Sequence, residues 1–199
     1  MDVFVAVLFF AFSSTITPGP NNLMMLSSGV NYGVRASLPH FFGICLGFPA
    51  MVLVVGLGFD AVFQQLPWLH PLIKWAGIAY LLYLAYVIAT TAPRQLQGTD
   101  RRPMTFLQAA AFQWVNGKAW IMASGAIAAF SQSAAMTESV LAITFAFLVV
   151  AFPCVGLWLT SGAYLRQHLE SETAQRWFNR SMGALLVASV VPVVWELLT

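Results

Sequence analysis

Charged side chains are scarce in this sequence: Asp, Glu, Lys and Arg together make up 8% of its 199 residues. A soluble domain carries roughly 25% charged residues, which keep its surface in water. Hydrophobic residues instead make up 59% of the chain, and the mean hydropathy is +0.77. Lipid tails solvate such a surface, so the composition predicts an integral membrane protein in a lipid bilayer. The net charge is only +2, and no basic cluster is dense enough to indicate a nucleic-acid partner.

Residues that hold metals or form disulfides are also few. The two cysteines, Cys45 and Cys154, each lie alone in an apolar run, and the three histidines are scattered along the chain. No CxxC or Cys/His spacing is present, so we expect no disulfide framework, no metal site and no cofactor. A cationic segment is missing before the first apolar run, where Asp2 is the only charge. That run is therefore predicted to be a retained span and not a cleaved signal peptide.

Long apolar stretches are what the sequence has in abundance. A helix that crosses about 30 Å of hydrocarbon needs about 20 mostly apolar residues. Such stretches predict an all-α integral membrane protein of about six transmembrane helices, built as a single membrane domain over residues 1–199 with no separate soluble domain. The predicted spans cover approximately residues 3–30, 37–60, 69–91, 105–130, 138–164 and 178–198.

The basic residues predict the orientation of the spans. Cytoplasmic loops of membrane proteins carry an excess of Lys and Arg. On the opposite side of the predicted membrane only Lys74 is basic. The arginine loops should therefore be cytoplasmic and both termini periplasmic. The loops after spans one, three and five hold seven arginines: Arg35, Arg94, Arg101, Arg102, Arg166, Arg176 and Arg180.

The two halves of the chain resemble each other weakly. Phe-Pro occurs inside the second span at Pro49 and inside the fifth span at Pro153. This pattern predicts two three-helix repeats, 1–92 and 105–199, joined by a cytoplasmic basic loop at 93–104. Three spans per repeat is an odd number, so the repeats would be inverted relative to each other. Because the matching residues are common ones, a chance resemblance stays the alternative.

The first span is interrupted by Thr17 and the run Pro18, Gly19, Pro20, Asn21 and Asn22. Proline lacks a backbone donor and obstructs the preceding helical turn, so a regular helix cannot continue here. Backbone groups left unpaired in lipid cost several kcal/mol each, so the break must face protein or a watery cavity. A helix that restarts after the break would present free amides and the positive end of its dipole, which suit a carboxylate. A simple loop between two helices is the alternative.

The fourth span holds a second polar segment, with Gln113, Asn116, Gly117 and Lys118. A lysine flanked by long apolar runs needs a partner or water, because burying its charge is expensive. We expect its ammonium to attract a substrate carboxylate or to swing between partners during transport. The alternative is a lysine that reaches the cytoplasmic interface. Gly117 beside Asn116 would permit a local break, which predicts broken helices in spans one and four.

Gating and coupling are less determined by the sequence. Pro49 and Pro153 would kink their helices, and with Gly117 they are candidate gating residues, although the kinks would equally serve packing alone. No carboxylate lies plainly at mid-membrane. If transport is coupled to protons, the proton carrier would be Lys118, His40 or the substrate itself.

Several segments together resemble the LysE/RhtB family of amino-acid exporters. The resemblance covers essentially the whole chain and is most specific at the first of its motifs. It rests on residues 17–22, Gly33, Arg35, Gly43, Gly47, residues 75–81 and residues 112–118.

This resemblance implies a bacterial inner-membrane exporter of amino acids or their derivatives, driven by the proton gradient. It also implies six spans in two inverted repeats and alternating access. Many family members have proline where this chain has Gly117, and this difference disfavours lysine as the exported substrate. In a related superfamily, cysteines near helix breaks relay electrons, but Cys45 and Cys154 lie away from the predicted breaks.

The sequence therefore predicts a transporter and not an enzyme. Its substrate would be a small amino acid held by Pro18, Gly19, Pro20, Asn21, Asn22, Gln113, Asn116 and Lys118. Three rivals stay open: a passive channel for small polar solutes, a non-transporting membrane protein and a thiol-redox membrane protein. A homo-oligomer is neither indicated nor excluded by the sequence.

Overall fold

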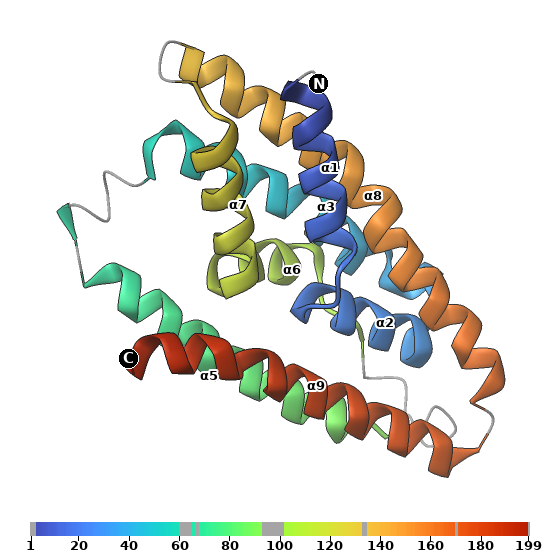
Figure 1. Cartoon of the computed structure of the whole chain (residues 1–199). Coiled ribbons are helices and arrows are strands. Elements are labelled where there is room, and N and C mark those ends of the chain that lie inside the picture. The colour runs from blue at the N-terminus through green and yellow to red at the C-terminus, as the bar shows by residue number, and fades with distance from the viewer. Residues whose placement is uncertain are drawn as a thin grey trace.

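The computed structural model describes residues 3–59, 65–66, 68–92, 102–132, 135–169 and 171–198. Within these ranges the chain is helical and contains no strand, which confirms the all-α prediction. Figure 1 shows the path of the helices. In chain order they are α1 (Val3–Ile16), α2 (Pro20–Tyr32), α3 (Val34–Val54), α5 (Leu69–Ala89), α6 (Phe106–Phe112), α7 (Gly117–Phe130), α8 (Met136–His168) and α9 (Glu172–Leu198), with a π-helical turn at Val55–Phe59 and a 3₁₀ turn at Gln113–Val115.

Helix length and composition support a membrane location. In the described part of the chain, three helices are long and apolar enough to cross a bilayer: Val34–Gly58, Pro71–Ala89 and Met136–His168. A fourth span is added if α1 and α2, which are bent by 55° at a short break, are counted together. The predicted fourth span is divided between α6, α7 and the 3₁₀ turn, so neither helix alone is long enough. The predicted sixth span, within α9, is not among the helices that meet this criterion.

Most of the helices pack around α3 and α8. The small residues Gly43 and Gly47 of α3 lie against α6, where a Cβ on Gly47 would lie 2.6 Å from the Cα of Ala110. On the other side of the core, α2 crosses α8 at Gly29 and Gly162, and a Cβ on either residue would collide with the backbone of the other helix. These backbone contacts, which small residues permit, fix α2 and α6 relative to the core.

The helices α5 and α9 form a second packing unit. Figure 1 shows them side by side along one edge of the molecule, and they pack extensively on each other. Leu81 of α5 and Leu186 of α9 lie in one buried cluster with Leu23 of α2 and Phe112 of α6. The pair α5 and α9 therefore contacts the rest of the molecule at α2 and α6, the helices next to the two predicted breaks.

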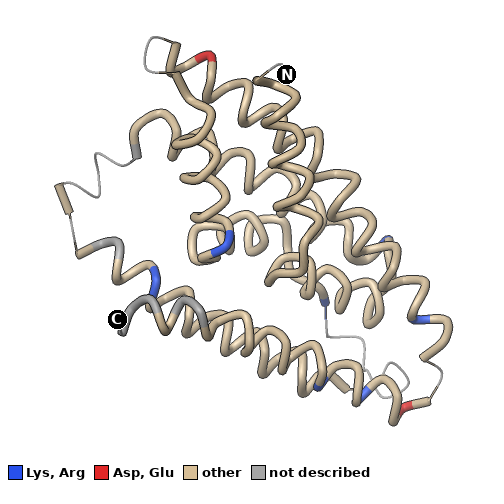
Figure 2. Tube along the Cα trace, in the orientation of Figure 1, with Lys and Arg blue, Asp and Glu red and all other residues tan. Residues whose placement is uncertain are grey.

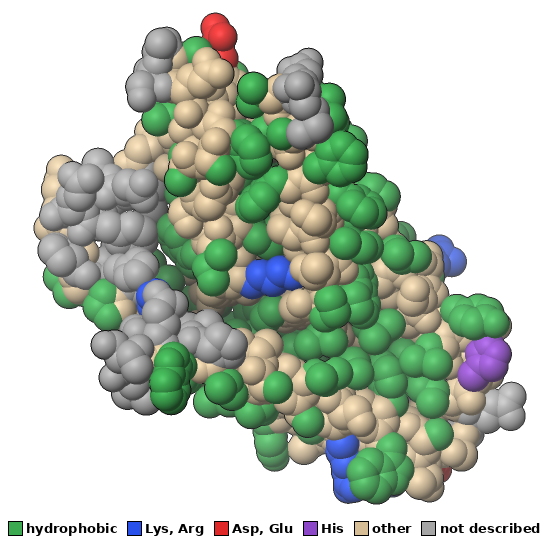
Figure 3. Space-filling model, in the orientation of Figure 1, with side chains coloured by type: hydrophobic (Ala, Val, Ile, Leu, Met, Phe, Trp, Pro, Cys, Tyr) green, Lys and Arg blue, Asp and Glu red, His purple; other side chains and the backbone are tan. Residues whose placement is uncertain are grey.

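The outer surface is apolar. Figure 2 shows few charged residues along the described chain, and the face drawn in Figure 3 is mostly hydrophobic or uncharged. Large side chains such as Phe9, Ile121, Tyr86 and Val191 are each more than 60% exposed. Exposed apolar area of this extent indicates lipid contact and not a water-facing surface.

The first helical segment extends beyond its predicted end at residue 30. Asn31 lies in the last turn of α2 and pairs with Asn179 of α9, and both side chains are buried. Placing Asn31 in a connecting loop was therefore wrong, because its amide is satisfied inside the protein. Pro49 and Pro153 lie inside the continuous helices α3 and α8.

Candidate functional site

The break between α1 and α2 follows directly from its two prolines. Gly19 is extended, with φ −174° and ψ 179°, and Pro20 occupies the first turn of α2. Proline is favoured there because the first amides of a helix have no intrahelical acceptor. The helix therefore stops at Ile16 and restarts at Pro20 with a bend of 55°. This confirms the predicted interruption of the first span.

The break before α7 is built without proline. Asn116 leaves the helical conformation, with φ −87° and ψ 104°, and its side-chain oxygen accepts from the backbone N–H of Lys118 at 3.2 Å. Asparagine is among the best residues for this capping role. A 3₁₀ turn over Gln113–Val115 precedes it. The predicted break in the fourth span is therefore present, and Gly117 is the first residue of the restarted helix.

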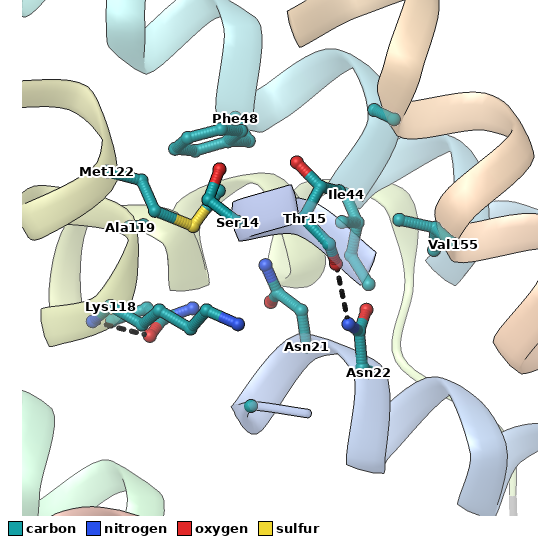
Figure 4. Close-up of a pocket in the computed structure, with 13 residues that line it drawn as sticks. Ser14, Thr15, Asn21, Asn22, Ile44, Phe48, Lys118, Ala119, Met122 and Val155 are labelled. Atoms are coloured by element: carbon teal, nitrogen blue, oxygen red, sulfur yellow. Dashed lines mark hydrogen bonds between the residues drawn. The ribbon is translucent and has the colours of Figure 1, made fainter. Parts of the chain in front are cut away.

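The two breaks face each other, and Lys118 joins them. Its ammonium Nζ donates to the carbonyl oxygen of Thr17 at 2.8 Å and contacts the Thr17 hydroxyl at 2.9 Å. The carbonyl oxygen of Pro18 lies at 3.4 Å. Figure 4 shows Lys118 extending from α7 toward the first turn of α2. The lysine therefore lies on the carbonyl end of α1, where the helix dipole is negative.

Two further side chains cover the carbonyl end of α1. The Nδ2 atom of Asn22 donates to the carbonyl oxygens of Thr15 and Thr17, both at 2.8 Å. The indole Nε1 of Trp158, on α8, donates to the carbonyl oxygen of Ile16 at 3.1 Å. Carbonyls that a helix end leaves unpaired need such partners when they are away from water. The break is thus satisfied from three different helices.

A pair of amide side chains forms a second link between the breaks. The Nδ2 atom of Asn21 donates to Oε1 of Gln113 at 2.8 Å, and Nε2 of Gln113 donates back to Oδ1 of Asn21 at 3.2 Å. Gln113 is fully buried and also donates to the carbonyl oxygen of Ala109 at 2.9 Å. This reciprocal pair holds the first turn of α2 against the 3₁₀ turn.

A small cavity of about 30 Å³ lies between the two breaks. Apolar side chains of α3, α7 and α8 form part of its wall. Its polar lining, which Figure 4 labels except for Asn116, comes from Ser14, Thr15, Asn21, Asn22, Asn116 and Lys118. The backbone N–H groups of Asn21 and Asn22 find no acceptor within the described residues, because they belong to the first turn of α2. The cavity therefore adjoins free amide donors, an ammonium and the carbonyl end of a helix.

The surroundings of the two breaks differ. Next to the α1–α2 break lies a larger hollow of about 370 Å³, lined by residues of α2, α8 and α9 that include Trp158 and Met182. The α6–α7 break has no such space on the α5 side, because a Cβ on Gly77 would collide with the carbonyl oxygen of Val115. One break therefore lies beside open volume and the other is clamped by α5.

The residues that the sequence proposed for the site are mostly brought together. Pro18, Gly19, Pro20, Asn21 and Asn22 form the first break, and Gln113, Asn116 and Lys118 lie across from them. The proposed gating role of Pro49, Pro153 and Gly117 stays a prediction. Sequence reasoning missed Trp158, because a tryptophan inside an apolar span gives no signal that its indole caps a remote helix. It also missed the role of the Thr17 carbonyl and hydroxyl, although Thr17 belongs to the motif.

Potential metal ligands and thiols are few in the described part of the chain. The described residues hold no group of three or more His, Cys, Asp or Glu side chains placed to bind a metal ion. Cys45 and Cys154 are buried and free. Within the described chain Lys118 has no carboxylate partner, and its ammonium is held by neutral oxygens.

Comparison with known proteins finds relatives among bacterial efflux proteins. The sequence is 36% identical over 118 residues to cysteine/O-acetylserine efflux proteins of Escherichia coli K12, Shigella flexneri serotype 5b and Shigella sonnei. That alignment covers 59% of this chain and 60% of the relatives, so the chain spans about 60% of the length of the curated relatives it matches. No solved structure matches.

The sequence model of the LysE type translocator family matches residues 12–194, which include both helix breaks and every predicted site residue. A translocator family consists of membrane transporters and not of enzymes. The chain belongs to the LysE-type translocator family.

Proposed function

We propose that this protein is a secondary active exporter of a small amino acid or amino-acid derivative across the bacterial inner membrane. Its six spans form two inverted three-helix repeats, 1–92 and 105–199, with both termini periplasmic and the loop 93–104 cytoplasmic. Protons drive the transport by alternating access. Membership of a translocator family supports the general activity, and the names of the curated relatives support an amino-acid substrate.

The observation that carries the proposal is the contact between the two helix breaks. Lys118 of one break donates to the carbonyl oxygen of Thr17 in the other, and Asn21 pairs with Gln113 across the same gap. Broken helices are tolerated at membrane depth where they are buried in protein or line a watery cavity. Transporters built from inverted repeats use such half-helix ends to hold substrate and coupling ions.

The charges at the breaks complement a zwitterion. A substrate carboxylate would accept from the free N–H groups of Asn21 and Asn22, at the positive end of the α2 dipole. A substrate α-ammonium would take the carbonyl oxygens of Thr17 and Pro18, which Lys118 occupies in the structure. Binding would then release Lys118 toward the carboxylate, which is the swing between partners that we propose for this residue.

The unequal surroundings of the breaks support two access states. The hollow of about 370 Å³ beside the α1–α2 break gives α9 room to move, whereas α5 is closed on the α6–α7 break. Inverted repeats exchange such arrangements when one repeat rocks against the other. Substrate binding needs to shift this equilibrium by only a few kcal/mol.

The cavity favours a small substrate side chain. The apolar wall beside Lys118 comes from residues such as Ile44, Phe48 and Met122, and these leave little room and offer no charged partner. Within the cavity lining the only charged side chain is that of Lys118. A neutral amino acid of the size of cysteine or O-acetylserine therefore fits the site better than lysine.

The proposal is tested by accumulation in proteoliposomes. Purified protein is reconstituted, a pH gradient is imposed, and uptake of radiolabelled O-acetyl-L-serine, L-cysteine and L-lysine is followed. An exporter accumulates at least one neutral amino acid above the outside concentration and loses it when a protonophore is added. Equilibration without accumulation would favour the passive channel, and no uptake of any solute would favour a non-transporting protein.

A further inference from the structure

A second polar cavity lies one helical turn away from the break, toward the end of α2. It is enclosed by α2, α3, α5 and residues 102–104, and its volume is about 80 Å³. Ser27 and Ser28 of α2, His40 of α3 and Arg102 line it, together with apolar side chains of α5. Apart from His40, which sequence reasoning considered only as a proton carrier, none of these residues was predicted to have a functional role.

His40 is unusual for a residue so deeply buried. Its side chain is only 1% exposed, and its Nδ1 lies 2.9 Å from the hydroxyl oxygen of Ser28. The other ring nitrogen, Nε2, is buried and has no partner in the described part of the chain. A buried polar atom without a partner destabilises the folded protein, so the binding of a ligand that pairs with this atom is favoured.

The hydrogen bond to Ser28 determines what Nε2 offers. If the Ser28 hydroxyl donates to Nδ1, the ring proton lies on Nε2 and only that N–H is left unpaired. If Nδ1 donates instead, the hydroxyl proton of Ser28 also lacks an acceptor, because Nδ1 is the only partner of that hydroxyl. The first arrangement leaves fewer unsatisfied groups, so His40 offers a donor.

The remaining polar groups of the cavity also favour an anion. The hydroxyl oxygen of Ser27 accepts from Nδ2 of Asn31 at 3.2 Å, which leaves the hydroxyl proton of Ser27 free to donate. Arg102 is exposed at the mouth of the cavity and adds a positive charge. A guanidinium, a hydroxyl and an imidazole N–H together are a donor set that fits a carboxylate.

The cavity between the breaks and the cavity beside His40 differ in volume, and this difference suits them to different roles. A water molecule needs about 10–15 Å³ of such volume. The cavity of 30 Å³ between the breaks therefore holds two or three waters, whereas the cavity of 80 Å³ accommodates the carboxylate and ammonium of an amino acid. In the described state the second cavity is therefore the roomier of these two polar cavities.

An apolar barrier lies between the two cavities. Met24 lines the second cavity and is three residues from Asn21, which lines the first. Met24 is 3% exposed and belongs to one buried cluster with Leu84 and Phe112. Beyond it, Asn31 and Asn179 form a reciprocal amide pair at 2.9 and 3.1 Å, which holds α2 to α9.

We infer that the His40 cavity is a waiting site for the carboxylate of the exported amino acid, occupied from the arginine-rich side before Met24 moves and admits the substrate to the breaks. The inference rests on the proposed function, because it assumes that an amino acid is exported. The carboxylate faces Arg102 and accepts from Ser27, and it accepts from His40 Nε2 once that covered atom turns to the cavity. Substrate capture and substrate translocation are thus performed by different groups.

Everted membrane vesicles, in which export appears as uptake, test the inference with O-acetyl-L-serine as probe. Arg102→Gln and His40→Leu are compared with Arg176→Gln, an arginine of α9 that lies 51% exposed beside Glu172. We expect the first two to raise KM about tenfold, a loss equivalent to one hydrogen bond to a charged group. Maximal rates should stay within about twofold, and Arg176→Gln should change neither value.

Three outcomes would overturn the inference. Unchanged KM in Arg102→Gln, whose side chain is exposed and not needed for folding, would do so even if His40→Leu failed to fold. Competition by acetate as strong as that by O-acetyl-L-serine would indicate a general anion site. If the wild-type protein transports no amino acid at all, the proposed function falls together with the waiting site, whereas normal transport with unchanged KM removes the waiting site alone.

Discussion

The two helix breaks reach the same arrangement by different means. The α1–α2 break is forced by Pro18 and Pro20, and its carbonyl oxygens are satisfied by its own Asn22 and by Lys118 and Trp158 from other helices. The α6–α7 break contains no proline and is capped by its own Asn116. The first break therefore depends in part on side chains of other helices that are able to leave, whereas the second is capped by a side chain of its own segment.

This difference indicates which break moves. Carbonyls held by a long, flexible lysine beside a hollow of about 370 Å³ are suited to exchanging partners during transport. The break that is self-capped and pressed against Gly77 is suited to staying in place. Substitutions at the two breaks should accordingly differ: those at the first should change transport rate, and those at the second should change stability.

The largest effect is expected for Lys118→Gln. The variant removes an ammonium that contacts three oxygens of the first break, and hydrogen bonds to charged groups contribute about 1.5–3 kcal/mol. We expect the rate of counterflow in proteoliposomes to fall by about 10- to 100-fold. Lys74→Gln on α5 is the matched control, and a loss of equal size in that variant would remove the special role of Lys118.

Gly77→Ala should affect stability instead of rate. The added Cβ would collide with the carbonyl oxygen of Val115, and overpacking of this kind costs about 1–3 kcal/mol. For a protein of this size, a loss of about 2 kcal/mol lowers Tm by roughly 4–8 °C. Thermal unfolding in detergent measures this change. Gly125→Ala is the control, because its nearest neighbour would be Cζ of Phe10 at 3.9 Å. An unchanged Tm for Gly77→Ala would mean that α5 does not clamp the second break.

The amide pair between the breaks should show coupling of intermediate size. Asn21→Leu and Gln113→Leu each leave a partner unsatisfied, whereas the double variant removes both groups. A double-mutant cycle on the free energy of unfolding, measured by thermal unfolding, should therefore give a coupling of about 1 kcal/mol. Additive single effects would show that the pair does not hold the breaks together.

The smallest effect is expected for the cap of α7. Asn116→Ala removes the acceptor for the Lys118 backbone N–H and should lower stability by about 1 kcal/mol, while Asn116→Asp should retain the cap. Thermal unfolding of both variants checks this. If Asn116→Ala slowed transport as much as Lys118→Gln, the distinction between a moving and a fixed break would fail.

The sequence predicted the breaks well, for a physical reason. Proline cannot continue a helix wherever it folds, so the stop before Pro18 and the restart at Pro20 follow from local chemistry alone. Asn116 likewise has a strong capping preference. Lys118 was recognised because an ionisable group inside an apolar run must find a partner.

What could not be predicted depends on packing between distant segments. The partners of Trp158 and Asn179 are set by which helices meet, and neither residue has a local pattern that reveals them. Asn31 was wrongly assigned to a loop, because a polar residue near an arginine is as typical of a cytoplasmic turn as of a buried amide pair. The number of spans could not be predicted either, because some spans are interrupted. Hydropathy alone does not tell whether two short helices such as α6 and α7 form one span.

The central claim is that the two breaks enclose a wet site that the substrate enters, and a cysteine at Ser14 tests it directly. Ser14 lines the cavity beside Lys118, whereas Phe12 on the same helix is 52% exposed on the outer surface. In a background with Cys45 and Cys154 replaced by alanine, a membrane-impermeant thiol reagent should label Ser14→Cys and not Phe12→Cys, and the transported amino acid should protect Ser14→Cys. A Ser14→Cys variant that transports normally but is never labelled would contradict the account, because the breaks would then lie in dry packing.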